Sequence, residues 1–167
     1  MGRKAELEGE KLRRALTQAP QALILEIDKE LRRTTPVDVG NARANWVPSV
    51  GTPHTGGATR RGSGSAERAA GVTAVLAYEL DQGPLYVSNG VPYIRRLNDG
   101  WSKQAPALFV EAAVDVALGR VQAKYGAAIN LDRAAIVGSL AGGANYLGGD
   151  MAGNLAGAYS PFGGDDD

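Results

Sequence analysis

The side chains that could support catalysis or metal binding are few and scattered along this sequence. The single histidine, His54, lies in a stretch rich in Gly, Ser and Thr without a neighbouring carboxylate, and there is no cysteine. A lone imidazole in such a loop is more often solvated than catalytic. The carboxylate pairs Glu79/Asp81 and Asp38/Glu67 have no spacing typical of metal binding or acid–base catalysis. We therefore predict neither a metal site nor a catalytic residue.

The glycine-rich stretches also lack the patterns that bind nucleotides or expose a nucleophile. A phosphate-binding loop needs Gly-x4-Gly-Lys-Ser/Thr, which the sequence does not contain. Gly62-Ser63-Gly64 lacks the third glycine and the preceding strand of a dinucleotide-binding fingerprint. Residues 62–66 (GSGSA) do not match the Gly-x-Ser-x-Gly of a nucleophile elbow. We predict no cofactor, and a protein that is not an enzyme.

Length and composition limit the number of domains, the kind of core and the classes of partner that the chain can have. The chain has 167 residues, enough for one ordinary domain, and its 18 basic and 18 acidic side chains balance, which argues against a general nucleic-acid binder. Aromatic residues make up 6% and there are 23 glycines, so the core must consist mainly of Ala, Val and Leu. No apolar run is long enough for a membrane span or a signal peptide, which suggests a cytoplasmic setting. So small a core suggests that the chain needs a partner or copies of itself.

Charge is unevenly distributed along the chain. Residues 1–33 hold eight basic and six acidic side chains, and residues 34–104 hold seven and five. Residues 105–167 hold three and seven, including the last three residues, Asp165, Asp166 and Asp167. A basic front and an acidic tail suit head-to-tail contact between copies; a solvated tail is the simpler interpretation.

The first half of the chain predicts a long helix followed by a turn and a strand. A stripe of apolar residues at helical spacing indicates a helix over 3–33, and its members are Leu12, Leu16, Leu23, Ile27 and Leu31. Pro20 predicts a kink or two helices meeting near Ala19. Thr35-Pro36 should end it. A turn over 37–41 and a short strand within 44–50 follow. Residues 51–65, with Arg60 and Arg61 at their centre, predict a mobile loop.

The second half predicts a further helix, a hairpin and a second long helix. A helix is expected over 65–80, with Ser65 as its N-cap and Gly71 as a weak point. Leu85 to Ser88 should form a strand, which Asn89-Gly90 would turn into a second strand over 91–97. Pro106 to Tyr125 predicts a helix that is apolar almost all round, and hence buried on its own sheet and on a neighbouring subunit. Residues 129–137 predict a last helix or strand, and 138–164 an irregular tail.

Two blocks of sequence stand out from this background. The first runs from Thr35 to Trp46 (TPVDVGNARANW), and the second from Tyr86 to Ala107, ending in Ser102-Lys103-Gln104-Ala105-Pro106-Ala107. In order, spacing and flanking helices they resemble the tail-completion or neck protein family of long-tailed bacteriophages, the minor-tail-protein-Z-like group. The resemblance covers about residues 5–125. It departs at Val39, where the family has Thr, and at Leu108, where it tends to have Gly.

The resemblance implies a virion structural protein of the phage neck, assembled in the host cytoplasm. It would form a homo-oligomeric ring, six- or twelve-fold, that completes the tail or joins it to the head. Its partners would be the connector or stopper and the tail terminator or tail tube, with nucleic acid at most in the ring lumen and no membrane. We expect two parts, a tail-completion domain over 1–125 and a Gly-rich extension over 126–167 that binds a partner or is flexible.

The residues of the two blocks have either an interface role or an ordinary role in turns and caps. Asp38 and Ser102 would cap, Gly40 and Gly100 would occupy turns at positive φ, Tyr93 would lie on the sheet, and Lys103 and Gln104 would bond to a partner. The candidate interface residues are Thr35, Pro36, Asp38, Gly40, Arg43, Trp46, Asn89, Pro92, Tyr93, Arg95, Leu97, Gly100, Ser102, Lys103, Gln104 and Pro106.

Two other functions compete with the structural one. A DNA-contacting accessory protein of head completion or packaging is suggested by the arginine pairs 13/14, 60/61 and 95/96, although the neutral net charge disfavours it. A hydrolase of the cell wall would need a carboxylate pair or metal cluster, and the sequence shows none at a recognisable spacing. For the fold we predict the α+β class, with two long helices packed on a small antiparallel sheet.

Overall fold

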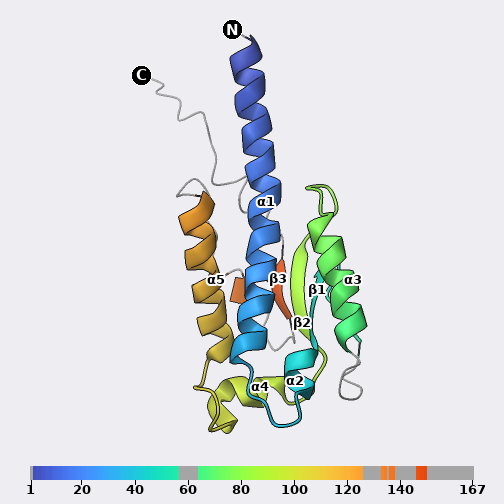
Figure 1. Cartoon of the computed structure of the whole chain (residues 1–167), viewed down its shortest axis with the longest axis vertical. Helices are drawn as coiled ribbons and strands as arrows, with labels where there is room; N and C mark the ends of the chain where they lie inside the picture. The colour runs from blue at the N-terminus through green and yellow to red at the C-terminus, as the bar shows by residue number, and fades with distance from the viewer. Residues whose placement is uncertain (1, 57–63, 126–132, 135, 138–145, 150–167) are drawn as a thin grey trace.

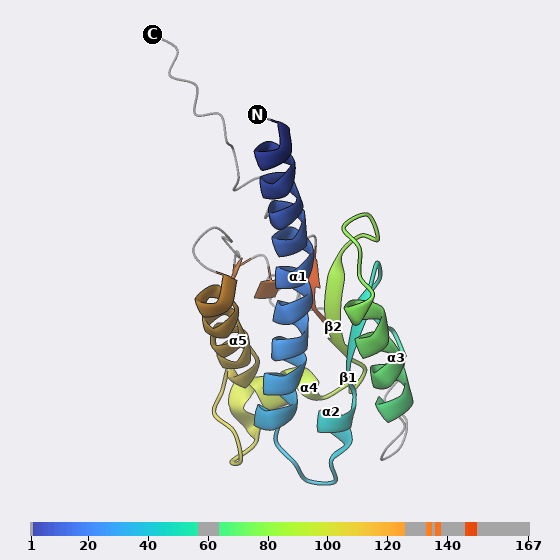
Figure 2. The ribbon, with the colours of Figure 1, turned by 45° about the horizontal axis from the view of Figure 1, so that its top comes forward.

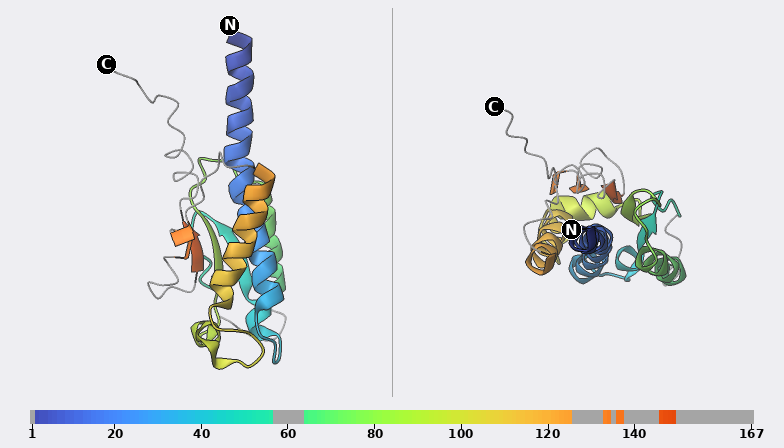
Figure 3. Two further views of the ribbon diagram at one scale, coloured as in Figure 1. Left: turned by 90° about the vertical axis from the view of Figure 1, so that its left-hand side faces the viewer. Right: turned by 90° about the horizontal axis from the view of Figure 1, so that it is seen from above.

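The computed structural model describes residues 2–56, 64–125, 133–134, 136–137 and 146–149. Three helices, α1 (Gly2–Thr34), α3 (Gly64–Leu76) and α5 (Phe109–Tyr125), lie over one side of a small sheet (Figures 1 and 3). The sheet has the order β1 (Trp46–Val50), β2 (Leu85–Asn89), β3 (Tyr146–Gly149). Three short helical turns gather at one end: α2 (Asn41–Ala44), α4 (Ile94–Arg96) and the π-helical turn η1 (Leu97–Trp101). The α+β prediction is confirmed.

Helix α1 is the spine of the molecule and is longer than its packed part. It runs continuously through Pro20, so the predicted pair of helices meeting near Ala19 does not form. Ala19 and Pro20 are buried. The packing around them keeps the helix continuous, although proline lacks the backbone N–H that would donate one helical hydrogen bond. Residues 2–11 are exposed, and the N-terminal turns project beyond the sheet (Figure 2). The helix ends at Thr34, as the Thr35-Pro36 pair predicts.

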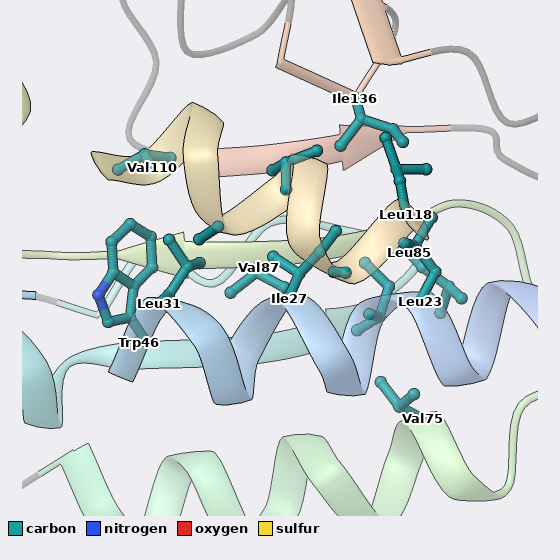
Figure 4. Packing of buried hydrophobic residues seen from close by; sticks show 14 of the residues in the cluster. Leu23, Ile27, Leu31, Trp46, Val75, Leu85, Val87, Val110, Leu118 and Ile136 are labelled. Carbon is teal, nitrogen blue, oxygen red and sulfur yellow. The ribbon is translucent and has the colours of Figure 1, made fainter. Parts of the chain in front are cut away.

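The core lies between α1, α5 and the sheet. Leu23, Ile27 and Leu31 of α1 have no exposed surface and point into it, as predicted from their spacing (Figure 4). The earlier members of the predicted stripe, Leu12 and Leu16, are only half-buried because they lie where α1 leaves the domain. One face of a single helix therefore organises most of the apolar packing.

Helix α5 buries one face against α1 and exposes the other. Its buried residues are Phe109, Val110, Ala113, Val114, Ala117, Leu118 and Val121. Its exposed side carries mostly small or polar residues, among them Ala112, Asp115, Gly119 and Ala123, with Val116 40% exposed. Within one chain the helix is thus buried on a single side. It begins at Phe109 rather than Pro106, because Leu108 has a left-handed φ of 61° that no helix continues through.

Helix α3 packs so closely on β1 that only glycine fits at the contact. A Cβ on Gly71 would lie 1.9 Å from the carbonyl oxygen of Pro48. The residue that weakens the helix prediction is therefore the one that permits the packing. The helix covers 64–76, so Ser65 lies inside it rather than at its cap. The helix ends at Leu76, before the predicted end at Leu80. At this end, Gln21 of α1 donates hydrogen bonds to the carbonyl oxygens of residues 76 and 78.

Strands β1 and β2 pair antiparallel, with Trp46 opposite Asn89 and Val50 opposite Leu85. Helix α3 lies between them in the chain, so this partner of β2 comes from before the helix and not from the residues after Asn89. The predicted hairpin at Asn89-Gly90 is wrong, since residues 91–97 form a turn, α4 and the first residue of η1 instead of a strand. Tyr93 is 41% exposed and does not lie on the sheet.

Two pieces of the chain after residue 125 join this domain. Ile136 is 3% exposed within the core, and the described residues among 133–137 are helical. Strand β3 pairs antiparallel with β2, Ser88 opposite Tyr146 and Leu85 opposite Gly149, so the tail predicted as irregular is a strand here. The rest of that tail, and residues 57–63 of the predicted mobile loop with Arg60 and Arg61, lie outside the described residues.

Candidate functional site

The two sequence blocks lie together at the end of the molecule formed by α2, α4 and η1, the lower end in Figure 1. They surround a hollow of about 190 Å³. The first block lines it with Pro36 and residues 38–42, and the second with Tyr93, Leu97, Ser102 and Gln104. The backbone N–H of Val37 donates a 2.9 Å hydrogen bond to Oε1 of Gln104. Gln104, expected to bond to a partner, thus ties the two blocks within one chain.

The first block is anchored in the core by Thr35 and Trp46. The Thr35 hydroxyl donates to the carbonyl oxygen of Leu31 in the last turn of α1 and accepts a 2.8 Å hydrogen bond from Nε1 of Trp46. Both side chains are nearly fully buried. A buried indole N–H needs such an acceptor. These two candidate residues therefore stabilise the fold and offer no surface to a partner.

Asn89 joins the second block to the first. Its Nδ2 donates to the carbonyl oxygen of Ala42 at 2.9 Å, and its Oδ1 accepts from the N–H of Val91 at 3.0 Å. The side chain is 1% exposed, so both bonds are made away from water. Asn89 does shape a turn, as predicted, but the turn leads into α4 and holds α2 in place.

Asn98 supports this end of the molecule but was not among the predicted candidate residues. Its Oδ1 accepts from the N–H of Val110 at 2.9 Å, and its Nδ2 donates to the Glu111 carboxylate at 2.9 Å. Its own carbonyl accepts from the N–H of Leu108 at 2.7 Å. Asn98 thus caps α5 from a distant part of the chain. The Asn-Asp-Gly composition indicated only a turn, and nothing in it pointed to a partner 12 residues away.

Backbone conformation at this end agrees with the glycine predictions and corrects two capping predictions. Gly40 and Gly100 have φ of 80° and 89°, as expected for their turns. Asp38 does not cap α2, whose cap residue is Gly40 without a side-chain hydrogen bond. Ser102 does not cap α5; its hydroxyl accepts from the N–H of Gln104 at 3.2 Å in a local turn.

Large apolar side chains are exposed at this end. Val39, Tyr93, Trp101 and Leu108 are 53, 41, 77 and 57% exposed. The guanidinium of Arg96 lies 5.2 Å from the centre of the Trp101 ring, a cation–π contact. We call this region the end surface, and it consists of these four apolar residues with the exposed basic residues Arg43, Arg95, Arg96 and Lys103. Pro92 and Pro106 are also exposed, while Leu97 packs against the core and Pro36 is half-buried.

A different set of charges ties the helices together in the middle of the molecule. Asp28 and Glu30 of α1 are 0 and 1% exposed. Arg68 of α3 bonds both oxygens of Asp28, while Arg120 of α5 bonds Glu30 and Glu26. Burial alone would raise the pKa of Glu30, but hydrogen bonds from Arg33 and Arg120 outweigh it and lower the pKa below its ordinary value. These ion pairs are structural.

The arginine pairs that suggested DNA contact do not form one surface in the part of the chain that the structure describes. Arg13 and Arg14 line a groove of about 340 Å³ beside Leu76. They lie some 20 residues before the end of α1, which corresponds to about 30 Å along the helix, whereas Arg95 and Arg96 belong to α4 at the opposite end. Among the described residues no group of His, Cys, Asp and Glu is placed to hold a metal ion, and no helix is long and apolar enough to cross a membrane.

Comparison with known proteins adds no identification. No family model matches the chain, and no curated protein and no solved structure matches it either. The features of the chain that bear on its function are the two sequence blocks and the end surface that they form.

Proposed function

We propose that this protein is a structural component of a bacteriophage neck or tail. It forms a homo-oligomeric ring at the head–tail junction, and completes the tail or joins it to the head connector. Its work is binding and closure rather than catalysis. The observation that carries the proposal is that the two blocks resembling the tail-completion family, separate in sequence, fold into one surface with exposed apolar and basic side chains.

The chemistry of the end surface supports a binding role. Trp101 is 77% exposed, so apart from its contact with Arg96 it contributes little to the packing of the isolated chain. Exposed apolar side chains gathered at one place and rimmed by charge are typical of protein–protein contact sites. The side chains that support this surface, Thr35, Asn89 and Asn98, are buried and hydrogen-bonded, so it is held in a defined shape.

Leu108 gives independent support to the resemblance. It is the position where the family tends to have glycine, and it has a φ of 61°, in the left-handed region that glycine adopts without strain. Leucine is therefore a strained residue in a backbone conformation suited to the family's own residue. Its side chain is 57% exposed, so little burial offsets the strain.

A charge reversal at the end surface tests the binding role. The double variant Arg95→Glu with Lys103→Glu should block assembly and leave the monomer folded, because both side chains are exposed. Circular dichroism checks the fold, and the yield of joined particles checks assembly. A yield equal to that of the wild type, from a folded variant, contradicts an interface here.

Electron microscopy of particles assembled without this protein tests the function itself. DNA-filled heads lying beside separate tails are the expected result, because the joining step would be missing. Normally joined virions would contradict the proposal. Binding of duplex DNA with a steep salt dependence would then favour the accessory DNA-contacting function instead.

A further inference from the structure

We propose that the C-terminal segment of one copy of this chain, residues 150–167, binds the end surface of the next copy. The inference rests on the proposed self-assembly and names the contact that makes it directional. The charge of the end surface, the direction of β3 and the composition of the segment support this contact.

The end surface suits an acidic, aromatic ligand. Of the charged side chains in residues 35–45 and 92–108, four are basic (Arg43, Arg95, Arg96 and Lys103) and two are acidic (Asp38 and Asp99). The basic residues lie among Val39, Tyr93, Trp101 and Leu108, which expose 41 to 77% of their surface. A ligand that combines negative charge with aromatic side chains would match both features.

Strand β3, the last described part of the chain, runs away from the end surface of its own chain. Strand β2 runs toward that end, since Asn89 at its end bonds α2. Strand β3 is antiparallel to β2 and finishes with Gly149 opposite Leu85, at the far end of the sheet. The chain therefore leaves the sheet in the direction opposite to its own end surface. A neighbour placed head-to-tail would present its end surface on that side.

The segment has the composition that the end surface calls for. It carries four acidic residues and no basic ones, and its aromatic residues Tyr159 and Phe162 come just before the terminal Asp165, Asp166 and Asp167. Eighteen residues reach about 60 Å when extended, enough to pass from one copy to the next. This contact is heterologous, and repeated around an axis it closes a ring.

Cysteine cross-linking of the full chain tests the contact, because the natural sequence has no cysteine. One chain carries Val39→Cys on the end surface, and a second, isotopically labelled chain carries Ser160→Cys in the segment. The control replaces V39C by Ala5→Cys, an exposed position on the projecting part of α1. Under mild oxidation, the mixed V39C–S160C dimer should form at least about tenfold faster than the A5C–S160C dimer, since binding raises the local concentration.

Charge variants show whether the acidic end is what the surface recognises. Adding Arg43→Glu and Lys103→Glu to the V39C chain should slow mixed-dimer formation about tenfold, as expected for the loss of two exposed charge pairs. Changing Asp165, Asp166 and Asp167 to Lys in the S160C chain should then restore the rate with that reversed partner. Recovery of this kind requires the two regions to meet.

Equal rates for V39C and A5C, or a rate unchanged by charge reversal, would overturn the inference. If sedimentation then still shows associated wild-type copies, the proposed self-assembly stands and only the segment's role is wrong. A chain carrying both V39C and S160C distinguishes the remaining case. A disulfide formed within that single chain at high dilution would show that the segment binds its own end surface, which also contradicts the proposal.

Discussion

The middle of the molecule and its end surface are built on different principles. In the middle, apolar faces of α1 and α5 meet, Gly71 lets α3 approach the sheet, and buried carboxylates are paired with arginines. At the end surface, polar side chains hold backbone groups in place while Val39, Tyr93, Trp101 and Leu108 stay exposed. The middle supplies stability by burial, whereas the end surface is held in one shape and leaves its apolar groups exposed.

The largest expected effect is a loss of stability in the middle of the molecule. Gly71→Ala places a methyl group 1.9 Å from the carbonyl oxygen of Pro48, and both atoms belong to regular elements that cannot yield locally. We expect a loss of more than about 3 kcal/mol in the free energy of unfolding, as for severe overpacking. Urea denaturation followed by circular dichroism measures it.

Gly119→Ala is the matched control for that variant. Gly119 lies in α5, and a Cβ there has no atom within 4 Å. In an exposed helix position alanine should stabilise by about 0.5–1 kcal/mol. Equal effects of the two substitutions would show that helix propensity, rather than the contact with β1, decides the cost.

The next largest effect is a loss of stability at the hydrogen bonds that support the end surface. Asn98→Ala removes the acceptor for the N–H of Val110 and leaves that buried donor unpaired, so we expect a loss of about 2 kcal/mol. Thermal unfolding measures the loss. Asp99→Ala, at the exposed neighbouring position, should stay within about 0.5 kcal/mol of the wild type. A similar loss in both would mean that Asn98 has no special part in holding α5.

A smaller effect of opposite sign is expected at Leu108 of the end surface, where a substitution should stabilise the chain. Leu108→Gly should stabilise the chain by about 1 kcal/mol, because it removes the strain of a non-glycine residue at φ 61°. Leu108→Ala keeps the strain and loses the same exposed apolar surface, so it should bring no gain. Both variants should weaken assembly if the Leu108 side chain contacts a partner. A stabilised alanine variant would show that exposure, rather than φ, sets the cost.

The smallest effect is the pH dependence of the buried ion pairs. Burial would raise the pKa values of Glu26 and Glu30, but their arginine and lysine partners lower both below the ordinary 4.5. The unfolded chain then binds more protons at acid pH, so this stabilisation is present above pH 4.5 and is lost as pH falls through the lower, folded pKa values. The melting temperature should fall less between about pH 6 and about pH 3 in Arg120→Gln than in the wild type. Parallel curves would contradict a role for Arg120.

The sequence predicted the elements whose causes are local. The spacing of Leu23, Ile27 and Leu31 predicted the buried face of α1, the Thr35-Pro36 pair predicted its end, and the residue types within 44–50 and 85–88 predicted β1 and β2. The turns at Gly40 and Gly100 followed from composition. Each depends on a few neighbouring residues and on the backbone preferences of their types.

What failed depended on contacts between distant parts of the chain. Asn89-Gly90 was interpreted as a hairpin, but β2 pairs with β1, from before α3, and with β3, from after α5, and no local signal indicates either pairing. Gly71 was interpreted as a weak point of the helix, because the sequence does not show that it packs against the carbonyl oxygen of Pro48, where only glycine fits. Asn98 was passed over because its cap is built with α5.

The amino-acid sequence by itself therefore determined the approximate positions of α1, α3, α5, β1 and β2, the turns at Gly40 and Gly100 and the two blocks of the candidate site, since propensity and periodicity act over a few residues. Only the tertiary structure decided that those blocks meet around one hollow, that Thr35, Trp46 and Asn89 are buried supports, and that Val39, Tyr93, Trp101 and Leu108 are left exposed. Burial and exposure are properties of the whole packed chain, because each depends on which distant segments cover a side chain.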